Sequence, residues 1–232
     1  MDEIYQRTKL VIGNENLAKI KDSNICICGI GGVGSYALEA LARTGVGNIT
    51  IIDNDNVDIT NINRQLIAMV DNVGNSKVEE AKMRIKSINP QIKITSIQAF
   101  IDSYNVEKYI TDEYDYVVDA IDSVDSKIAI IKTCKAKNIK LISSMGMANR
   151  LDPLKIKVAD ISKTEICPLA KVIRKKLRDE NIRKVKVIFS TELPVKVING
   201  KLGSVSYVPG VAGLVIASEI IKDLINEKKD EY

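Results

Sequence analysis

The sequence predicts an α/β fold: a doubly wound, mostly parallel sheet followed by a smaller mixed α+β C-terminal part. Short apolar runs alternate with longer amphipathic segments up to about residue 150, and strands that alternate with helices form parallel sheets. A glycine-rich turn, Gly29-Ile-Gly31-Gly32-Val33-Gly34-Ser35, joins the first such strand to the first such helix. We expect a single domain over residues 1–232, with a core at 1–154 and a second part at 155–232.

The predicted elements follow in order along the chain. Strands are expected at 25–28, 49–52, 92–98, 116–118 and 141–143, and helices at 36–42, 77–88, 106–110 and 124–137. After residue 155, short β-like pieces at 156–158, 187–189 and 204–207 surround a basic helix at 169–178. A closing helix at about 213–225 carries apolar residues at Leu214, Ala217, Ile221 and Leu224.

Composition limits the class of protein. At 232 residues, with 45% hydrophobic and 28% charged residues and a net charge of +4, the chain is typical of one soluble domain. It has no apolar stretch near the roughly twenty residues that span a bilayer, and its start lacks the pattern of a signal peptide. We therefore expect a cytoplasmic protein without membrane contact. The sequence contains no histidine, which excludes histidine-based triads, proton shuttles and metal sites.

The four cysteines predict neither a zinc site nor a disulfide. No C-x-x-C pair occurs, so zinc is not expected. Cys26 and Cys28 alternate on a buried strand, and we expect them to point to opposite faces and to serve as small core residues. Cys167 precedes Pro168 at a helix start, where the helix dipole can lower a thiol pKa. Of a catalytic thiol and a tolerated surface thiol, we favour the second.

The glycine-rich turn predicts a nucleotide site. Gly29, Gly31, Gly32 and Gly34 lie where a strand becomes a helix, so the chain must turn tightly and can approach a phosphate beside unpaired N–H groups. Glycines also serve turns that bind nothing, so the motif is weak by itself. Asp53 ends the second strand about twenty residues later, where a carboxylate can accept hydrogen bonds from ribose hydroxyls. These features fit a nicotinamide dinucleotide and ATP equally.

The polar run from Asp53 to Gln65 favours ATP. Arg64 lies between Asn61, Asn63 and Gln65 in this run, and a guanidinium binds phosphate oxygens in a bidentate manner. Lys77 opens the following helix and can supply a second cation. The alternative is a solvated polar loop with a chance basic residue.

Two aspartates follow the strand at 116–118. Asp119 and Asp122 are therefore expected at its carboxyl end, where open sheets of this kind bind ligands. A carboxylate facing a triphosphate needs a cation between them, and Mg²⁺ is bound through one or two carboxylates together with phosphate oxygens. We assign the metal to Asp122, with Asp119 as the alternative ligand. Asp122 could instead cap the helix at 124–137, a role for which Ser123 competes.

Three motifs carry a family resemblance. The runs GIGGVGS (29–35), DNDNVDITNINRQ (53–65) and VVDAIDSVDSK (117–127) resemble those of the ubiquitin-activating-type, or ThiF-like, adenylating enzymes, which are Rossmann-like. The runs EALARTGVGNITIID (39–53), NVGNSKVEEAKMRIKSINP (72–90), DISKTEICPLAKVIRKKLR (160–178) and IFSTE (188–192) extend the resemblance to the branch of tRNA threonylcarbamoyladenosine dehydratases.

The resemblance implies roles for individual residues. Arg64 and Lys77 would neutralise the phosphates, Asp122 would bind Mg²⁺, and Arg7 would reach into the site of a neighbouring subunit in a homodimer. The expected ATP contacts are Gly29, Gly31, Gly32, Gly34, Asp53, Asp55, Asn61, Arg64, Gln65 and Lys77. Catalysis would rest on Arg64, Lys77, Asp122 and Arg7.

Residues 171–186, which include most of the basic helix, form the densest cationic segment of the chain. Leu169, Val172, Ile173 and Leu177 make one side apolar, so the cations should project outward. A solvated helix face and a footprint for RNA phosphates both explain this pattern. The expected tRNA contacts are Lys171, Arg174, Lys175, Arg178 and Arg183.

The activity that this resemblance implies is ATP-dependent adenylation of the carboxylate of threonylcarbamoyladenosine in tRNA, followed by dehydrative cyclisation. Sulfur-shuttle proteins are possible partners by the same likeness. An activator of a ubiquitin-like sulfur-carrier protein is the first alternative, which the missing zinc cysteines and the basic helix disfavour. A nicotinamide-binding oxidoreductase or sensor is the second, which Arg64, Lys77 and the missing histidine disfavour.

Overall fold

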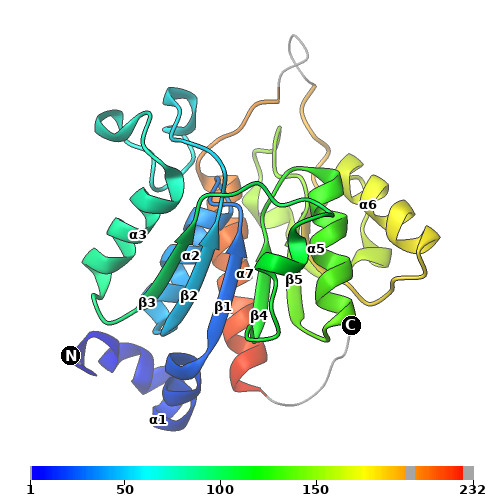
Figure 1. Ribbon diagram of the computed structural model, residues 1–232. Coiled ribbons are helices and arrows are strands. Elements are labelled where there is room, and N and C mark those ends of the chain that lie inside the picture. The colour runs from blue at the N-terminus through cyan, green and yellow to red at the C-terminus, as the bar shows by residue number, and fades with distance from the viewer. Residues whose placement is uncertain (1, 197–201, 227–232) are drawn as a thin grey trace.

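One seven-stranded sheet organises the molecule (Figure 1). The structure is a computed structural model that describes residues 2–196 and 202–226. The strand order is β3-β2-β1-β4-β5-β7-β6, and only β6 runs antiparallel to its neighbour. The strands are β1 Asn24–Cys28, β2 Asn48–Ile52, β3 Lys93–Ile97, β4 Tyr116–Asp119, β5 Lys140–Ser144, β6 Ile156–Asp160 and β7 Lys186–Ser190. The predicted α/β class is confirmed, and the C-terminal part extends the same sheet.

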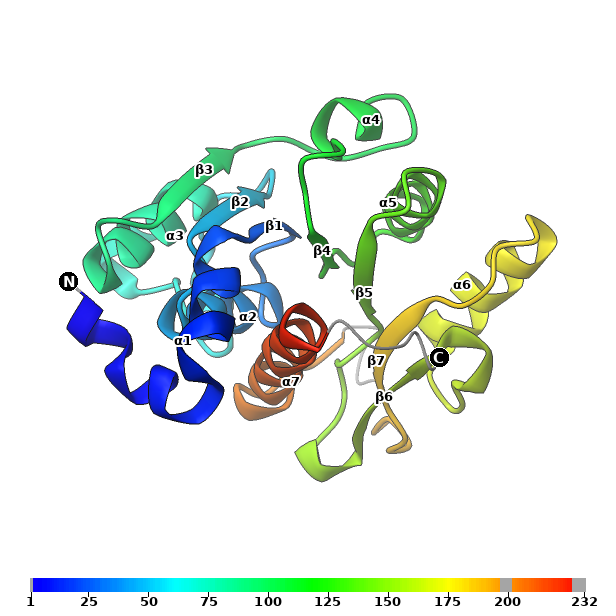
Figure 2. The ribbon, with the colours of Figure 1, turned by 90° about the horizontal axis from the view of Figure 1, so that it is seen from below.

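Helices cover both faces of the sheet (Figure 2). Those of the described residues are α1 Gln6–Asp22, α2 Gly34–Thr44, α3 Lys77–Ile88, α4 Val106–Tyr109, α5 Val124–Ala136, α6 Pro168–Asp179 and α7 Tyr207–Ile225. One face carries α2, α3 and α7, and the other carries α5 and α6. Across the described part of the chain, no helix combines the length and apolar character needed to cross a bilayer.

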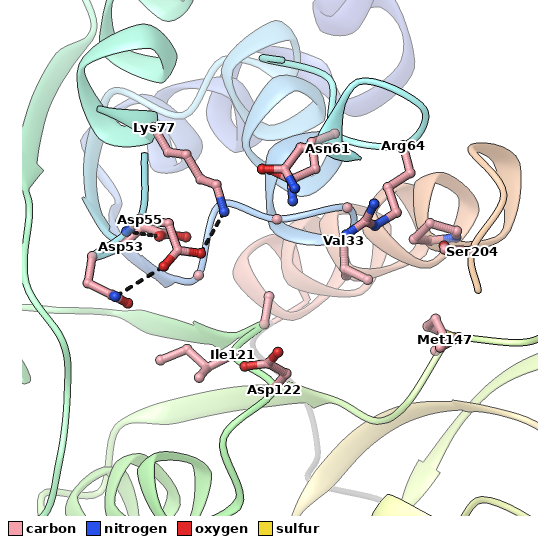
Figure 3. Close-up of a pocket in the computed structure, with 18 of the residues that line it drawn as sticks. Val33, Asp53, Asp55, Asn61, Arg64, Lys77, Ile121, Asp122, Met147 and Ser204 are labelled. Carbon is pink, nitrogen blue, oxygen red and sulfur yellow. Dashed lines mark hydrogen bonds and ion pairs between the residues drawn. The ribbon is translucent and has the colours of Figure 1, made fainter. Parts of the chain in front are cut away.

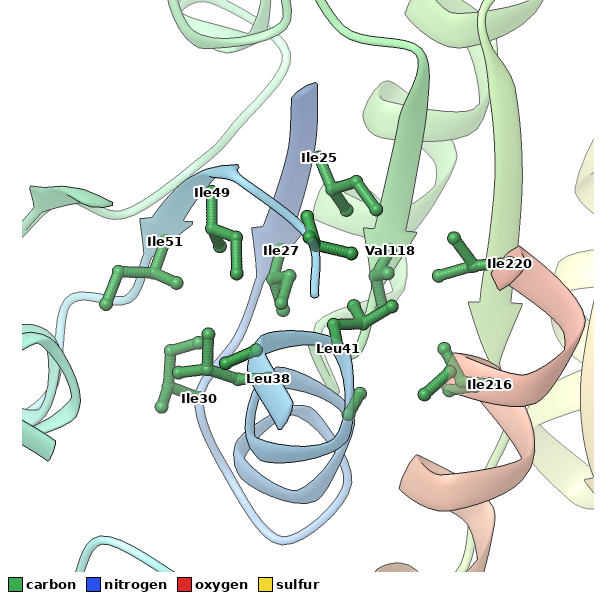
Figure 4. Close-up of a cluster of buried hydrophobic side chains, with 14 of the residues drawn as sticks. Ile25, Ile27, Ile30, Leu38, Leu41, Ile49, Ile51, Val118, Ile216 and Ile220 are labelled. Atoms are coloured by element: carbon green, nitrogen blue, oxygen red, sulfur yellow. The ribbon is translucent and has the colours of Figure 1, made fainter. Parts of the chain in front are cut away.

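Strand β1 divides the core into two layers because its side chains alternate between the faces of the sheet. Ile25 and Ile27 pack with α2 and α7 (Figure 4), whereas Cys26 and Cys28 belong to the apolar cluster under α5 and α6. The expectation that the two cysteines point to opposite faces was therefore wrong, since residues two apart in a strand share a face. Their Sγ atoms lie 3.9 Å apart, too far for a disulfide bond.

Helix α7 differs from its prediction at its start. It begins at Tyr207, so the strand expected at 204–207 is absent and the helix is a turn and a half longer than predicted. Pro209 lies in the first turn, where a helix needs no backbone N–H, so it does not break the helix. The buried side includes Val208, Ala212 and Ile216, whereas Leu214 is exposed.

Helix α1 was not predicted. It is kinked at Gly13, whose φ of 83° and ψ of 169° are not helical, and this interruption weakens the apolar periodicity. The segment is anchored by Tyr5, whose hydroxyl donates to the Ala42 carbonyl (3.1 Å) and accepts from Asn89 Nδ2 (2.9 Å). These contacts hold α1 below the amino ends of β1 and β2 (Figure 1).

Candidate active site

A cleft of about 1110 Å³ opens at the carboxyl ends of the central strands, the position at which open parallel sheets bind ligands. One wall bears Asn61, Arg64 and Lys77, and the loop with Asp122 lies opposite them (Figure 3). The cleft is long: Asp53 and Asp55 lie toward one end, and Met147 and Ser204 toward the other. The topology thus brings together the polar run at 53–65 and the aspartate loop, as the sequence predicts.

The four glycines of the turn have different roles. A Cβ at Gly29, where φ is +90°, would lie 2.7 Å from the Ala120 carbonyl oxygen, and one at Gly34 would lie 1.8 Å from the Gly29 oxygen. Both positions exclude any side chain because of the protein's own packing. Gly34 is buried at the start of α2 and does not line the cleft, unlike Gly29, Gly31 and Gly32. At Gly31 a Cβ would meet only Gln65 Nε2, at 3.9 Å, so this position leaves room for a ligand.

Asp53 stabilises the turn as well as lining the cleft. Its Oδ2 accepts the Ile30 N–H (2.7 Å) and its Oδ1 accepts the Asp55 N–H (2.8 Å). Burial raises the pKa of this carboxyl group above its usual value, although both backbone hydrogen bonds and the charge of Lys77 act to lower it. A carboxylate has about four lone-pair positions, so Asp53 retains the capacity to accept from ribose hydroxyls.

Lys77 and Asp55 form an ion pair toward one end of the cleft. Lys77 Nζ lies 2.7 Å from Asp55 Oδ2, and the lysine side chain is only 5% exposed while that of Asp55 is 55% exposed. The backbone fixes the same contact, since the Lys77 N–H donates to the Asp55 carbonyl (3.1 Å). The ammonium group is therefore held in place, and a phosphate would compete with Asp55 for it.

A short helical turn, η2 Ile59–Asn61, positions Asn61 and Arg64 on their wall of the cleft. Asp58 caps it by accepting the Thr60 N–H (2.8 Å), and Asn61 Oδ1 accepts the Asp58 N–H (3.1 Å) in return. Arg64 follows, with Nη1 donating to the Thr60 carbonyl (2.7 Å). Gln65 is buried, and within the described chain its Oε1 has no hydrogen-bond partner. The loop thus holds amide and guanidinium groups against the cleft.

Asp122 and Asp119 have different environments. Asp122 is exposed and lines the cleft, and it does not cap α5, because Ser123 accepts the Ser126 N–H there (3.5 Å). Asp119 is fully buried, and its Oδ2 lies 2.9 Å from Lys127 Nζ. Its charge is already compensated, so Asp122 is the better metal candidate. The described residues contain no group of three or more acidic or thiol ligands.

Arg7 does not lie in the cleft of its own chain. It is exposed on α1, below the amino ends of the strands, whereas the cleft opens at their carboxyl ends (Figure 1). Any contact between Arg7 and a nucleotide would have to involve the cleft of another subunit.

The basic helix α6 buries Ala170, Ile173 and Leu177, whereas Val172 is 44% exposed, contrary to the predicted apolar side. Arg174 is committed to the protein, since its Nη1 donates to both the carbonyl and the hydroxyl of Thr164 at 2.6 Å. The other predicted tRNA contacts are exposed at the surface: Lys171, Lys175, Arg178 and Arg183.

Cys167 is not a surface thiol. It precedes α6 and is only 3% exposed. Its Sγ lies 4.0 Å from the carbonyl oxygen of Gly146, in the loop after β5. The preference for a surface position was wrong because the helix start packs against the loop after β5, which the sequence does not reveal.

Several apolar cleft residues escaped prediction. Phe100, which is 53% exposed and follows β3, lines the cleft, as do Met147, Ala148 and Leu202. Single apolar residues in loops have no periodicity, so the sequence offers no signal for them.

The comparisons with known proteins agree with this geometry. The model of the ThiF family matches residues 5–232. A tRNA threonylcarbamoyladenosine dehydratase of Bacillus subtilis is 43% identical over 96% of this chain and 95% of its own length. The crystal structure of the Escherichia coli tRNA N6-threonylcarbamoyladenosine dehydratase in complex with AMP superposes with a TM-score of 0.92, at 39% identity over 96% of this chain and 94% of that one. A molybdopterin-synthase adenylyltransferase of Escherichia coli is 38% identical over 57% of this chain and 52% of its own length. The resemblance inferred from the motifs is thereby confirmed: the chain belongs to the ThiF family.

Proposed function

We propose that the protein is an ATP-dependent tRNA threonylcarbamoyladenosine dehydratase. The observation that carries this proposal is the cleft, which places the cations Arg64 and Lys77 opposite the free carboxylate of Asp122 beside a glycine-rich turn. The near full-length similarity to dehydratases, one of them solved with AMP and again with ATP, supports the choice of substrate.

The chemistry requires charge stabilisation more than proton transfer. A substrate carboxylate, already ionised at neutral pH, attacks the α-phosphorus of ATP, and the bond to pyrophosphate breaks. The resulting acyl adenylate has AMP as a good leaving group, and attack from within the modification closes a ring with net loss of water. Positioned cations are the main contribution that such a step needs from a protein. The absence of histidine is therefore no obstacle.

The cleft residues have distinct roles in this proposal. Asp53 accepts hydrogen bonds from the ribose, and the N–H groups of the turn and of Asn61 contact phosphates. Arg64 and Lys77 neutralise the charge that develops on the departing pyrophosphate. Lys77 reaches the phosphates by exchanging its ion pair with Asp55, which is only 2.7 Å away.

Magnesium fits the residues present. Mg²⁺ is commonly bound through one or two carboxylates together with substrate phosphates, and Asp122 supplies one carboxylate exposed to the cleft. The ion would screen the repulsion between Asp122 and the triphosphate. The buried pairing of Asp119 with Lys127 supports the choice of Asp122 over Asp119 as its ligand.

The same proposal extends to partners and location. The exposed cations of α6 would contact tRNA phosphates, and a homodimer would bring Arg7 to the partner's cleft. The enzyme would work in the cytoplasm on tRNA, and sulfur-shuttle proteins could assist it.

Mass spectrometry of tRNA nucleosides tests the proposal. Purified protein is incubated with ATP, Mg²⁺ and tRNA that carries threonylcarbamoyladenosine, and we expect a nucleoside lighter by one water together with AMP and pyrophosphate. A ubiquitin-like carrier protein with a free C-terminus replaces tRNA in the parallel reaction. AMP formation with the carrier and not with tRNA would contradict the proposal and favour the adenylyltransferase alternative.

A further inference from the structure

A buried ion pair lies directly behind the aspartate loop. Asp119 ends β4, Lys127 lies on α5 and Ser143 on β5, and all three residues are 0% exposed. Asp119 Oδ2 is 2.9 Å from Lys127 Nζ and accepts the Ser143 hydroxyl at 2.5 Å. Desolvating two charges often costs as much as their attraction returns, so stability alone does not account for such a pair.

The second oxygen of Asp119 connects this pair to the cleft. Oδ1 accepts the Ile121 N–H at 3.3 Å, and Ile121 is the residue before Asp122. On the other side, the Ala120 N–H donates to the Cys28 carbonyl (2.8 Å), and Ala120 packs so closely on Gly29 that no side chain fits there. The loop at 120–122 is therefore held between the glycine-rich turn and the Asp119 carboxylate.

We propose that Asp119 and Lys127 are positioning residues for Asp122. Lys127 fixes and neutralises the Asp119 carboxylate, and Asp119 fixes the backbone at Ile121, which sets how far Asp122 stands from the wall with Arg64 and Lys77. This inference rests on the proposed function, because it assigns the pair to catalysis through Asp122 and not through contact with substrate.

Two multiple variants separate positioning from stability. D119L/K127M/S143A removes both charges, the Ser143 hydroxyl and the acceptor for the Ile121 N–H. Its stability can remain near that of the wild type, because apolar replacement of a buried ion pair is often neutral. D119N/K127M also removes both charges but keeps an Oδ1 acceptor for Ile121, while its amide can donate to Ser143. The control is K186M, which breaks the ion pair between Lys186 and Asp223 (2.7 Å) at the amino end of β7.

Two readouts are needed, one of them independent of turnover. In D119L/K127M/S143A, backbone hydrogen exchange at Ile121 should accelerate, and kcat for tRNA-dependent AMP formation should fall by about tenfold or more with a smaller change in KM for ATP, as expected for a displaced group. D119N/K127M should restore slow exchange and most of kcat. K186M should lower the unfolding midpoint and leave kcat near that of the wild type.

The outcomes are separable. Wild-type kcat and exchange in the triple variant would overturn the inference, as would a D119N/K127M variant as inactive as the triple variant. If the triple variant does not fold, I121P deletes the N–H donor, and I121A, which keeps that donor, controls for loss of the side chain; a kcat of I121P equal to that of I121A overturns the inference equally. If the wild-type protein forms no AMP with tRNA, the proposed function fails, while the exchange comparison still tests whether the pair positions the loop.

Discussion

Arg64 is the residue on which the proposed chemistry depends most. Its guanidinium is held by the Thr60 carbonyl (2.7 Å) at the cleft wall, so its loss should remove charge stabilisation without disturbing the core. We expect R64A to lower kcat by about a hundredfold or more, the usual effect of deleting one such group. R43A is the matched control, because Arg43 pairs with Glu39 on α2 (2.7 Å) and does not line the cleft. Turnover by R64A within about threefold of the wild type would contradict the assignment.

The raised pKa of the buried Cys134 thiol predicts that the protein loses stability at alkaline pH. Burial, and then the charges of Cys26 and Asp119, raise the pKa of this thiol from 9.0 to about 12. Between these values the unfolded chain loses a proton that the folded protein keeps, so the free energy of unfolding falls as pH rises, by about 1.4 kcal/mol per pH unit for one such group.

The test compares unfolding of the wild type with that of C134A. Denaturant titrations at about pH 8 and about pH 10.5 should show a smaller loss of stability for C134A, because that variant lacks the thiol. The difference between the two proteins at the lower pH measures packing alone. Equal losses for both proteins would show that the Cys134 thiol ionises as readily when folded.

At the scale of elements, α6 and Arg183, which follows it, should form an RNA contact. We expect K175E/R178E/R183E to bind tRNA much more weakly and with a flatter salt dependence, because the variant contacts fewer tRNA phosphates. ATP binding should be retained. Arg174 is omitted because it is bonded to Thr164.

The charge-matched control for α6 is K82E/K93E/K157E. These three lysines lie outside α6, on α3, β3 and β6. The control has the same net charge as the α6 variant, so it reveals any effect of overall charge. Equal tRNA affinity of the two triple variants, measured at low salt, would show that α6 is only a solvated face.

The sequence predicted elements well where one period dominates. Helix α3 has its predicted bounds, and the central strands differ from theirs by one or two residues, because continuous apolar runs are typical of buried parallel strands. Helix α1 was missed because Gly13 interrupts it, and the start of α7 because residues 204–207 were assigned to a short strand. Both depend on tertiary contacts, with Asn89 and with α2, that no local pattern contains.

The candidate site was predictable to the same extent. Charged residues at the ends of strands are visible in the sequence, and Arg64, Lys77 and Asp122 do meet in one cleft. The burial of Cys167 and the pairing of Asp119 with Lys127 are products of packing between distant segments, so the sequence left them open or wrong.

At the scale of the whole molecule, we expect a two-fold homodimer in which each cleft receives Arg7 from the partner. This expectation rests on the location of Arg7 on α1, at the end of the sheet opposite its own cleft (Figure 1). From there Arg7 could contact a nucleotide only in the cleft of another subunit. R7A and R64A homodimers should each be nearly inactive. Random subunit exchange makes about half of the dimers mixed, and one of the two sites in each mixed dimer has both arginines intact. Roughly a quarter of all sites should therefore recover activity.

Labelled subunits report whether exchange has occurred. If mixed dimers form and activity stays at the level of the separate variants, Arg7 acts within its own chain or has no catalytic role. Sedimentation of the wild type as a monomer would contradict the dimer itself.

The packing of α7 against the glycine-rich turn has a consequence for biosynthesis. Gly213 lies so close to the turn that a Cβ there would be 2.4 Å from the Val33 carbonyl oxygen, and α7 makes extensive contact with α2. A ribosome produces the turn long before it produces α7. Through most of translation the nascent chain therefore carries a turn that Asp53 can hold but that α7 does not yet cover, and the lining of the cleft is complete only when Pro209 of α7 has docked.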